Sequence, residues 1–123
     1  MNNKPDAVLI VTVVNAGFVD LVMDSAKRVG ATGGTVLHGR GTGNKEIEKT
    51  FGILIHPEKD LVFIVVEKAK EAEVLTAIYR GAGLDTPGQG IAFSLPLSDT
   101  IGIHNIEAVS EDVPPAQSSG DEE

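Results

Sequence analysis

The chain contains no cysteine and no tryptophan, and its aromatic residues are four phenylalanines and one tyrosine. The lack of cysteine excludes disulfides, thiolate metal ligands and thiol nucleophiles. So few aromatic side chains leave little surface on which nucleic-acid bases could stack. The longest apolar run, Ala7–Val14, is far shorter than the roughly 18 residues that a membrane-spanning helix requires. We therefore expect no membrane insertion and no nucleic-acid binding, and the absence of a positively charged leader favours a cytoplasmic protein.

The negative charge is concentrated at the C-terminal end. The net charge of the chain is −8, and the segment 107–123 contains six acidic residues and no lysine or arginine. Without these six charges, residues 1–106 have a net charge of −2, which is unlike the basic face of a nucleic-acid-binding domain. The segment also contains a Pro-Pro pair and a Ser-Ser-Gly sequence, a composition typical of disorder. We predict one domain over residues 1–106 and an acidic, disordered tail over 107–123.

The first half of the domain has a strand–helix–strand pattern. Ala7–Val14 is an apolar, β-branched run that predicts a strand buried on both faces. Apolar residues then recur at helical spacing from Phe18 to Val29, and Gly30 is placed to end that helix. Thr35–His38 is expected to form the second strand.

The second half repeats the pattern. Two apolar runs, Phe51–Ile55 and Leu61–Val66, are separated by His56–Asp60, which predicts a β-hairpin with a proline-containing turn. A helix is expected over Glu67–Arg80, stopped by Gly81 and Gly83. The remaining segments predict a turn and two strands: Asp85–Gly90, Ile91–Leu97 and Asp99–Ile106.

The order of these elements predicts an α+β, ferredoxin-like βαββαβ fold. Such a fold has a four-stranded antiparallel sheet with two helices on one face. The strands are apolar at both odd and even positions, so the second face of the sheet is expected to be covered as well. Another copy of the chain is the expected cover, which predicts a homo-oligomer, with a closed ring as a plausible form.

Glycines surround the second predicted strand and mark a candidate binding loop. Residues 30–45 read GATGGTVLHGRGTGNK, and Arg40 lies between two of the six glycines. Such clustering indicates positive φ angles or the close approach of a ligand. Successive backbone N–H groups beside a cation can bind an anion. Two interpretations stay open from these residues alone: a loop that holds a phosphate-bearing ligand, or a mobile hairpin loop.

The glycine motifs resemble those of PII signalling proteins. The segment GATGGTV at residues 30–36, followed by RGTG at residues 40–43, is similar to the second strand and the start of the T-loop in that family. Gly88-Gln89-Gly90, followed by a short strand with Phe93, resembles the family's B-loop, and the preceding VLTAIYRGAG resembles its second helix. The order and spacing of these motifs agree over residues 7–105.

The resemblance implies a trimer that binds an adenine nucleotide (AMP, ADP, ATP or a cyclic nucleotide) in the clefts between subunits. It also implies regulation of a partner enzyme or membrane transporter through the loop around residues 40–58, and no enzymatic activity. The residues that it places at the nucleotide are Thr32, Gly33, Arg40, Gly41, Thr42, Gly43, Gly88, Gln89 and Gly90.

The chain departs from the family pattern mainly at its cations. The family's B-loop lysine and three of its arginines align here with Ile91, Asn44, Gly102 and His104. Arg40 and Lys45 remain, and Lys49 and His104 are further candidates for an anion contact. Because several cations are needed to balance a triphosphate, a mono- or diphosphate, a cyclic nucleotide or another small anion is the expected ligand. The tyrosine that is modified in the T-loop of the family is also absent, so uridylylation there is not expected.

Two alternative functions stay open. A CutA-like trimer that binds metal ions shares the fold, but His38, His56 and His104 are not spaced as metal ligands usually are. An amino-acid-binding module of the ACT type also has the βαββαβ order, yet it does not require the second glycine motif. No serine or threonine stands in a nucleophile elbow or next to a histidine in the sequence, so the sequence does not indicate an enzyme.

Overall fold

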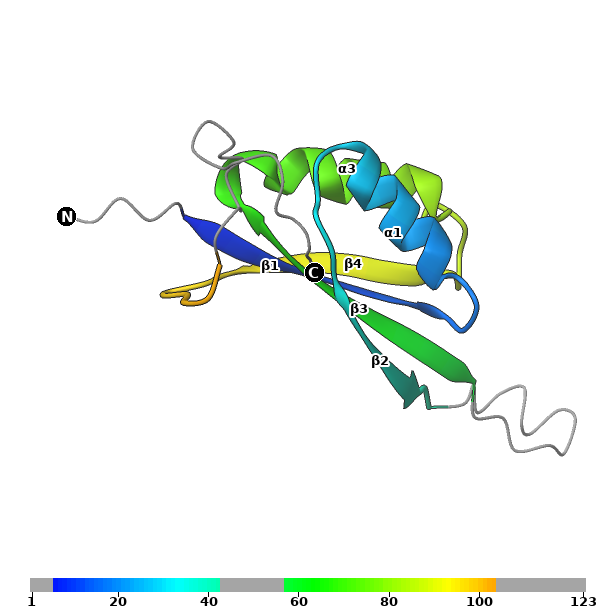
Figure 1. Cartoon of the computed structure of the whole chain (residues 1–123). Coiled ribbons are helices and arrows are strands. Elements are labelled where there is room, and N and C mark those ends of the chain that lie inside the picture. Colours follow the sequence, from blue (N-terminus) through cyan, green and yellow to red (C-terminus); the bar gives the residue numbers. More distant parts are fainter. Residues whose placement is uncertain (1–5, 43–56, 104–123) are drawn as a thin grey trace, which may run out of the picture.

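One antiparallel sheet, with both helices on the same face, forms the protein (Figure 1). The structure is a computed structural model that describes residues 6–42 and 57–103. The strands are β1 (Ala7–Asn15), β2 (Thr35–Arg40), β3 (Glu58–Glu67) and β4 (Gly90–Pro96), in the order β2-β3-β1-β4. The helices are α1 (Val19–Arg28) and α3 (Glu71–Gly81), the latter preceded by the short 3-10 helix η1 (Lys68–Lys70). The ferredoxin-like fold predicted from the sequence is confirmed.

The core lies between the sheet and the two helices. Strand β1 is central because β3 and β4 pair with its two edges. On its helix-covered face, Val8, Ile10 and Val14 are almost fully buried. They pack with apolar side chains of β3 and with Val22 and Ile78 of the helices. The continuous apolar run that predicted a buried strand thus forms the centre of the fold.

A glycine follows the C-terminal end of each helix, as predicted: Gly30 after α1 and Gly83 after α3. Gly30 has a φ of +113° and donates its N–H to the carbonyl oxygen of Lys27, while Ala31 donates to Ala26. This pair of bonds is the Schellman arrangement of a helix C-terminus. Gly83, with a φ of +72°, has the equivalent position after α3.

The prediction that Gly81 stops the second helix is wrong, because Gly81 is the last residue of α3 itself. A Cβ atom at Gly81 would lie 1.8 Å from Ser25 Oγ and 2.8 Å from Ser25 Cβ on α1. The glycine is required there because the two helices approach each other closely at this point.

The predicted turn over His56–Asp60 is wrong from Glu58 onward, because β3 begins at that residue. The predicted hairpin partner is also wrong for Leu61–Phe63. These residues pair with β1 along one edge and with Thr35–Leu37 of β2 along the other. The charged residues at the start of β3 do not end the strand, because their side chains have hydrogen-bond partners on the neighbouring strands. Lys59 donates to Asn15 of β1, and Asp60 is hydrogen-bonded to His38 of β2.

Two further boundaries differ from the prediction. The predicted helix over Glu67–Arg80 begins later, because Glu67 belongs to β3 and η1 precedes the α-helical turns. The predicted last strand, Asp99–Ile106, is wrong over residues 99–103, which have no strand structure. Residues 104–106, the apolar run Phe51–Ile55 and the acidic segment 107–123 lie outside the described residues.

The sheet face opposite the helices, here called the open face, is apolar over its central part. It carries the odd-numbered residues of β1, their partners on β3 and β4, and the β2 residues that pair with that side of β3. Its large apolar residues are Leu9, Val11, Val13, Leu37, Leu61, Phe63, Val65, Ile91, Phe93 and Leu95, and its polar residues are Asn15, Thr35, Lys59 and Glu67. Phe93 is 42% exposed and Ile91 is 61% exposed. An exposed apolar face that spans four strands marks an interaction surface.

Glu71, the first residue of α3, joins this helix to η1 and β4. Its carboxylate accepts a hydrogen bond from Lys68 Nζ at 2.6 Å and another from Ser94 Oγ. The bond from Lys68, and to a smaller extent the bond from Ser94, holds the pKa of Glu71 below its ordinary value of 4.5. A carboxyl group with a lowered pKa stabilises the fold above its unfolded-state pKa, and this contribution is lost as the pH falls through the folded-state pKa.

We therefore expect the free energy of unfolding to fall as the pH is lowered below 4.5, and Glu71→Gln to weaken that dependence. Urea unfolding at about pH 7 and about pH 3 measures both quantities. Glu73→Gln is the control, because Glu73 lies in the same helical turn and its carboxylate is near Lys70 instead of Lys68 and Ser94. An unchanged pH dependence in Glu71→Gln would contradict the assignment.

Candidate functional site

Two glycine segments that are far apart in the sequence lie at the same end of the sheet. At this end β1 and β2 finish while β3 and β4 begin. The register pairs Arg40 with Glu58, Asn15 with Lys59, and Val14 with Gly90. Gly41, which follows β2, and the turn at residues 88–90, which precedes β4, therefore flank this end from opposite edges.

The turn at residues 88–90 contains two glycines that are needed for different reasons. Gly88 has a φ of +84°, and a Cβ atom on it would meet nothing within 4 Å. Its backbone is therefore open to an approaching ligand. Gly90 is packed instead against β1, since a Cβ atom on it would lie 2.2 Å from the carbonyl oxygen of Val13. A loss of binding in a Gly90 variant would thus not identify Gly90 as a ligand contact.

A polar network holds this turn against the ends of β1 and β3. Asn15 Nδ2 donates to the carbonyl oxygen of Gly88 at 3.3 Å and to Gln89 Oε1 at 3.1 Å. Lys59 Nζ donates to Asn15 Oδ1 at 2.6 Å. Gln89 Nε2 in turn donates to the carbonyl oxygen of Ala82 at 2.9 Å. The side chain of Gln89 is thus already bonded within the chain, and the polar residues nearest the turn include two that the sequence prediction missed, Asn15 and Lys59.

The other predicted site residues are spread over the chain. Thr32 and Gly33 are exposed and precede β2, so the six-residue length of that strand separates them from Gly41 by about 20 Å. Arg40 and Thr42 are exposed at the other end of β2. Gly43, Lys45, Lys49 and His104 lie outside the described residues.

Arg40 lies on the opposite side of the sheet from Lys59. Side chains alternate between the faces of a strand, and Val36 of β2 pairs with Val62, a core residue on the helix-covered face. Arg40 shares that face with Val36. Lys59 has the opposite parity to Val62 and bonds Asn15 on the open face. The cation singled out from the sequence is therefore not the one beside the network that holds the turn.

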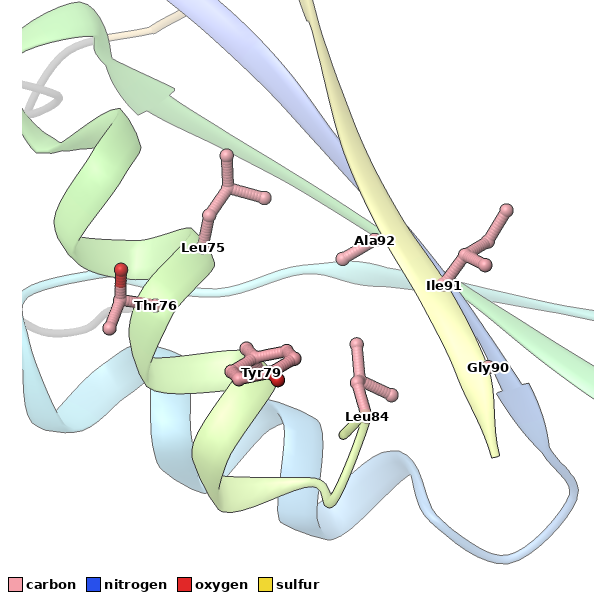
Figure 2. A pocket seen from close by; sticks show the side chains of 7 residues that line it. All are labelled: Leu75, Thr76, Tyr79, Leu84, Gly90, Ile91 and Ala92. Atoms are coloured by element: carbon pink, nitrogen blue, oxygen red, sulfur yellow. The ribbon is translucent and has the colours of Figure 1, made fainter. Parts of the chain in front are cut away.

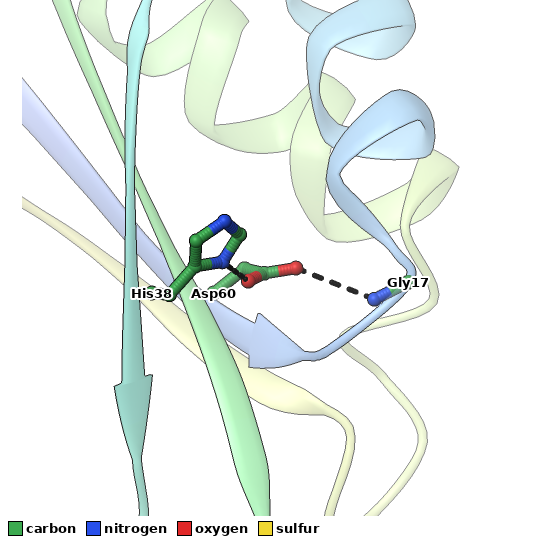
Figure 3. Close-up of polar contacts among 3 residues, drawn as sticks. All are labelled: Gly17, His38 and Asp60. Atoms are coloured by element: carbon green, nitrogen blue, oxygen red, sulfur yellow. Dashed lines mark hydrogen bonds and ion pairs between the residues drawn. The ribbon is translucent and has the colours of Figure 1, made fainter.

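His38 forms a dyad with Asp60 on the helix-covered side of β2 and β3 (Figure 3). His38 Nδ1 lies 2.6 Å from Asp60 Oδ1, and the other carboxylate oxygen accepts the N–H of Gly17 at 3.3 Å. Asp60 is buried, whereas the side chain of His38 is 83% exposed. Asp60 thus connects β3 to β2 and to the loop between β1 and α1, and Nδ1 of His38 is not available to a ligand.

We expect Asp60→Ala to lower the free energy of unfolding by about 2 kcal/mol, because the N–H of Gly17 loses a charged acceptor and His38 loses its partner. His38→Ala should cost less than half as much, since its removal exposes the remaining carboxylate to water. Denaturant unfolding of the two variants measures this difference. Equal losses would show that the contact with His38, and not the bond to Gly17, determines the contribution of Asp60.

A shallow groove of about 450 Å³ lies between α3 and β4 (Figure 2). Its lining residues are Leu75, Thr76, Tyr79, Leu84, Gly90, Ile91 and Ala92. Gly90 is the one predicted site residue among them, and no charged side chain lines the groove. The groove therefore lacks a cationic side chain that would balance the charge of a phosphate.

The described residues offer no support for a metal centre. Over residues 6–42 and 57–103, no cluster of three or more His, Asp or Glu side chains could hold a metal ion. Within the same ranges, neither helix has the length and apolar character to cross a bilayer.

The comparisons with known proteins agree with this geometry. A plant PII protein from Arabidopsis thaliana, in a crystal structure bound to citrate, superposes with a TM-score of 0.64 at 24% identity. The alignment covers 88% of this chain and 92% of that protein. The GlnK–ATP complex of B. subtilis gives a TM-score of 0.60 at 22% identity, covering 81% and 89% respectively. At these identities the two structures establish the fold alone.

A search of curated proteins gives no match. The family model of the nitrogen regulatory protein P-II, however, matches residues 7–107, which is most of the chain. The chain therefore belongs to the nitrogen regulatory protein P-II family, whose members are signalling regulators and not enzymes.

Proposed function

We propose that this protein is a trimeric regulator that binds an adenine nucleotide of low charge, such as AMP or ADP, between subunits. The observation that carries the proposal is the position of Gly41 and Gly88–Gly90 at one end of the sheet, with a polar network beside them. The backbone of Gly88 is exposed and that of Gly41 is half-exposed, so a ligand could approach the chain closely at this end of the sheet.

The ligands bound in the two structural neighbours support an anionic ligand. The plant protein is bound to citrate and the bacterial protein to ATP, and both ligands carry several negative charges at neutral pH. In this chain the apolar Ile91 follows the glycine turn directly, so the turn contributes no cation of its own. Fewer cations favour a nucleotide with one or two phosphates over a triphosphate.

The open face supports the trimer. Its apolar side chains extend across all four strands, and Leu37, Phe93 and Leu95 are each more than 40% exposed. Packing this face against identical faces in a closed ring would remove the apolar area from water. A cleft between subunits would then lie along the edges of the sheet, where the two glycine segments are found.

The proposed mechanism uses the segment that connects β2 to β3. The N–H of Gly41 donates to the carbonyl oxygen of Pro57 at 2.8 Å, which closes the base of this segment. A nucleotide that contacts Gly41 would therefore act at the base. The nucleotide shifts the segment between two conformations only if it binds the protein more tightly in one conformation than in the other. The segment would then bind or release a partner enzyme or membrane transporter.

A thermal-shift screen with AMP, ADP, ATP and cyclic AMP tests the ligand class. A nucleotide at 100 times its Kd should raise the free energy of unfolding by about 2.7 kcal/mol, with AMP or ADP more effective than ATP with magnesium. If no nucleotide shifts the melting temperature at millimolar concentration, the proposed ligand class is wrong.

The oligomeric state is tested separately. Light scattering should give three times the chain mass of 12.9 kDa. The substitution Phe93→Asp places a charge on the open face and should lower that mass, whereas Tyr79→Asp, on α3, should leave it unchanged. A monomeric wild-type protein would exclude a site between subunits.

A further inference from the structure

The ammonium group of Lys59 lies between the two glycine segments of one chain. Strands β3 and β1 separate Gly41 from the turn at residues 88–90. A Cβ atom on Gly41 would lie 3.2 Å from Lys59 Cε, so the lysine side chain passes directly beside Gly41. From there its Nζ atom reaches Asn15 Oδ1 at 2.6 Å.

Asn15 continues this connection to the turn. Its amide group accepts the bond from Lys59 through Oδ1 and donates through Nδ2 to the carbonyl oxygen of Gly88 and to Gln89. The amide thereby fixes the ammonium group one side chain away from the glycine turn. Lys59 is half-buried, so its position is restricted more than that of an exposed lysine.

The charge of Lys59 is not balanced by a carboxylate within the described ranges. Its hydrogen-bond partner there is the neutral amide of Asn15. By contrast, Lys68 is paired with Glu71 at 2.6 Å, and Lys70 lies 3.9 Å from Glu73. An ammonium group has three N–H donors, and the bond to Asn15 uses one of them. As far as residues 6–42 and 57–103 are concerned, Lys59 therefore retains both its charge and two N–H donors for an anion.

We propose that Lys59 is the phosphate-binding cation of the nucleotide site, positioned by Asn15 between Gly41 and the glycine turn. This inference rests on the proposed function, and it names the residue that supplies the charge. Lys59 and Ile91 both lie on the open face of the sheet. Lys59 on β3 would therefore supply the positive charge that Ile91, the residue after the glycine turn, does not carry. One ammonium group beside glycine backbone fits a mono- or diphosphate.

The substitution Lys59→Met tests this role by calorimetric titration with ADP. We expect the Kd for ADP to rise at least about tenfold, because a charge-assisted hydrogen bond to phosphate is lost. Lys59→Arg should retain most of the affinity. Lys27→Met is the matched control, since it removes the same charge from the exposed side of α1 and should leave the Kd within about twofold.

Two further measurements separate a charge contact from a structural role. Lys59→Gln keeps a hydrogen-bond donor for Asn15 and should still lose ADP affinity, and a thermal melt of each variant establishes that it is folded. The dependence of ADP binding on salt concentration should become weaker in Lys59→Gln than in the wild-type protein. If Lys59→Met and Lys59→Gln bind ADP as the wild-type protein does, the role of Lys59 is refuted while the proposed function stands. If the wild-type protein binds neither ADP nor AMP, both are refuted.

Discussion

Replacement of Gly90 by alanine is expected to destabilise the protein by about 3 kcal/mol. The added Cβ atom would lie 2.2 Å from the carbonyl oxygen of Val13 and 3.1 Å from Val14 Cα. Both atoms belong to the backbone of the central strand, so no side-chain rotation relieves the overlap. Either β4 separates from β1 at this end of the sheet, or the turn at residues 88–90 moves.

Thermal unfolding measures this effect. A loss of this size corresponds to a decrease in Tm of about 10–15 °C for a domain of this length. Gly33→Ala is the control, because a Cβ atom on Gly33 meets nothing within 4 Å and no positive φ is found there. We expect Gly33→Ala to leave Tm nearly unchanged. An unchanged Tm in Gly90→Ala would show that β4 does not pack on β1 in this way.

Alanine at Gly81 is expected to destabilise the protein by about 2–3 kcal/mol, opposite in sign to the usual effect in a helix. Alanine is ordinarily favoured over glycine inside a helix by about 1 kcal/mol. Here the new Cβ atom would lie 1.8 Å from Ser25 Oγ and 2.8 Å from Ser25 Cβ. The hydroxyl also donates to the carbonyl oxygen of Leu21 at 2.7 Å. Rotation of the hydroxyl would break that bond and still leave the Cβ atoms too close, so α1 and α3 must move apart.

A double-mutant cycle isolates this contact. Ser25→Gly removes both overlapping atoms, so Gly81→Ala should cost far less in the Ser25→Gly background than in the wild-type protein. Denaturant unfolding of the four proteins gives the coupling free energy. Additive losses would mean that the two helices do not meet at these residues.

Local patterns were sufficient for most of the fold. The apolar run Ala7–Val14 predicted the central strand, and the periodicity up to Val29 with Gly30 after it predicted α1 and its end. Both depend on residues that are adjacent in the sequence. The start of β3 was mispredicted because Pro57 and the charges at residues 58–60 are typical of a turn. Their partners, His38 and Asn15, belong to other strands.

The candidate site was predictable in part. The glycines at 41, 88 and 90 stand out by composition, and the fold brings them to one end of the sheet. Asn15 and Lys59 carry no such signal, since 44 residues separate them and their contact depends on the β1–β3 register. Gly34 illustrates the opposite error. A Cβ atom there would lie 3.0 Å from the carbonyl oxygen of Phe63, so packing within the chain accounts for this glycine without a ligand.

The central claim, that the protein binds an adenine nucleotide of low charge at a site between subunits, is tested most directly by calorimetric titration with ADP. The account predicts one ADP per chain with a Kd of about 100 µM or lower, on a particle with three times the mass of one chain. It also predicts weaker binding of ATP with magnesium. The absence of ADP and AMP binding at millimolar concentration, or binding by a monomer, would contradict it.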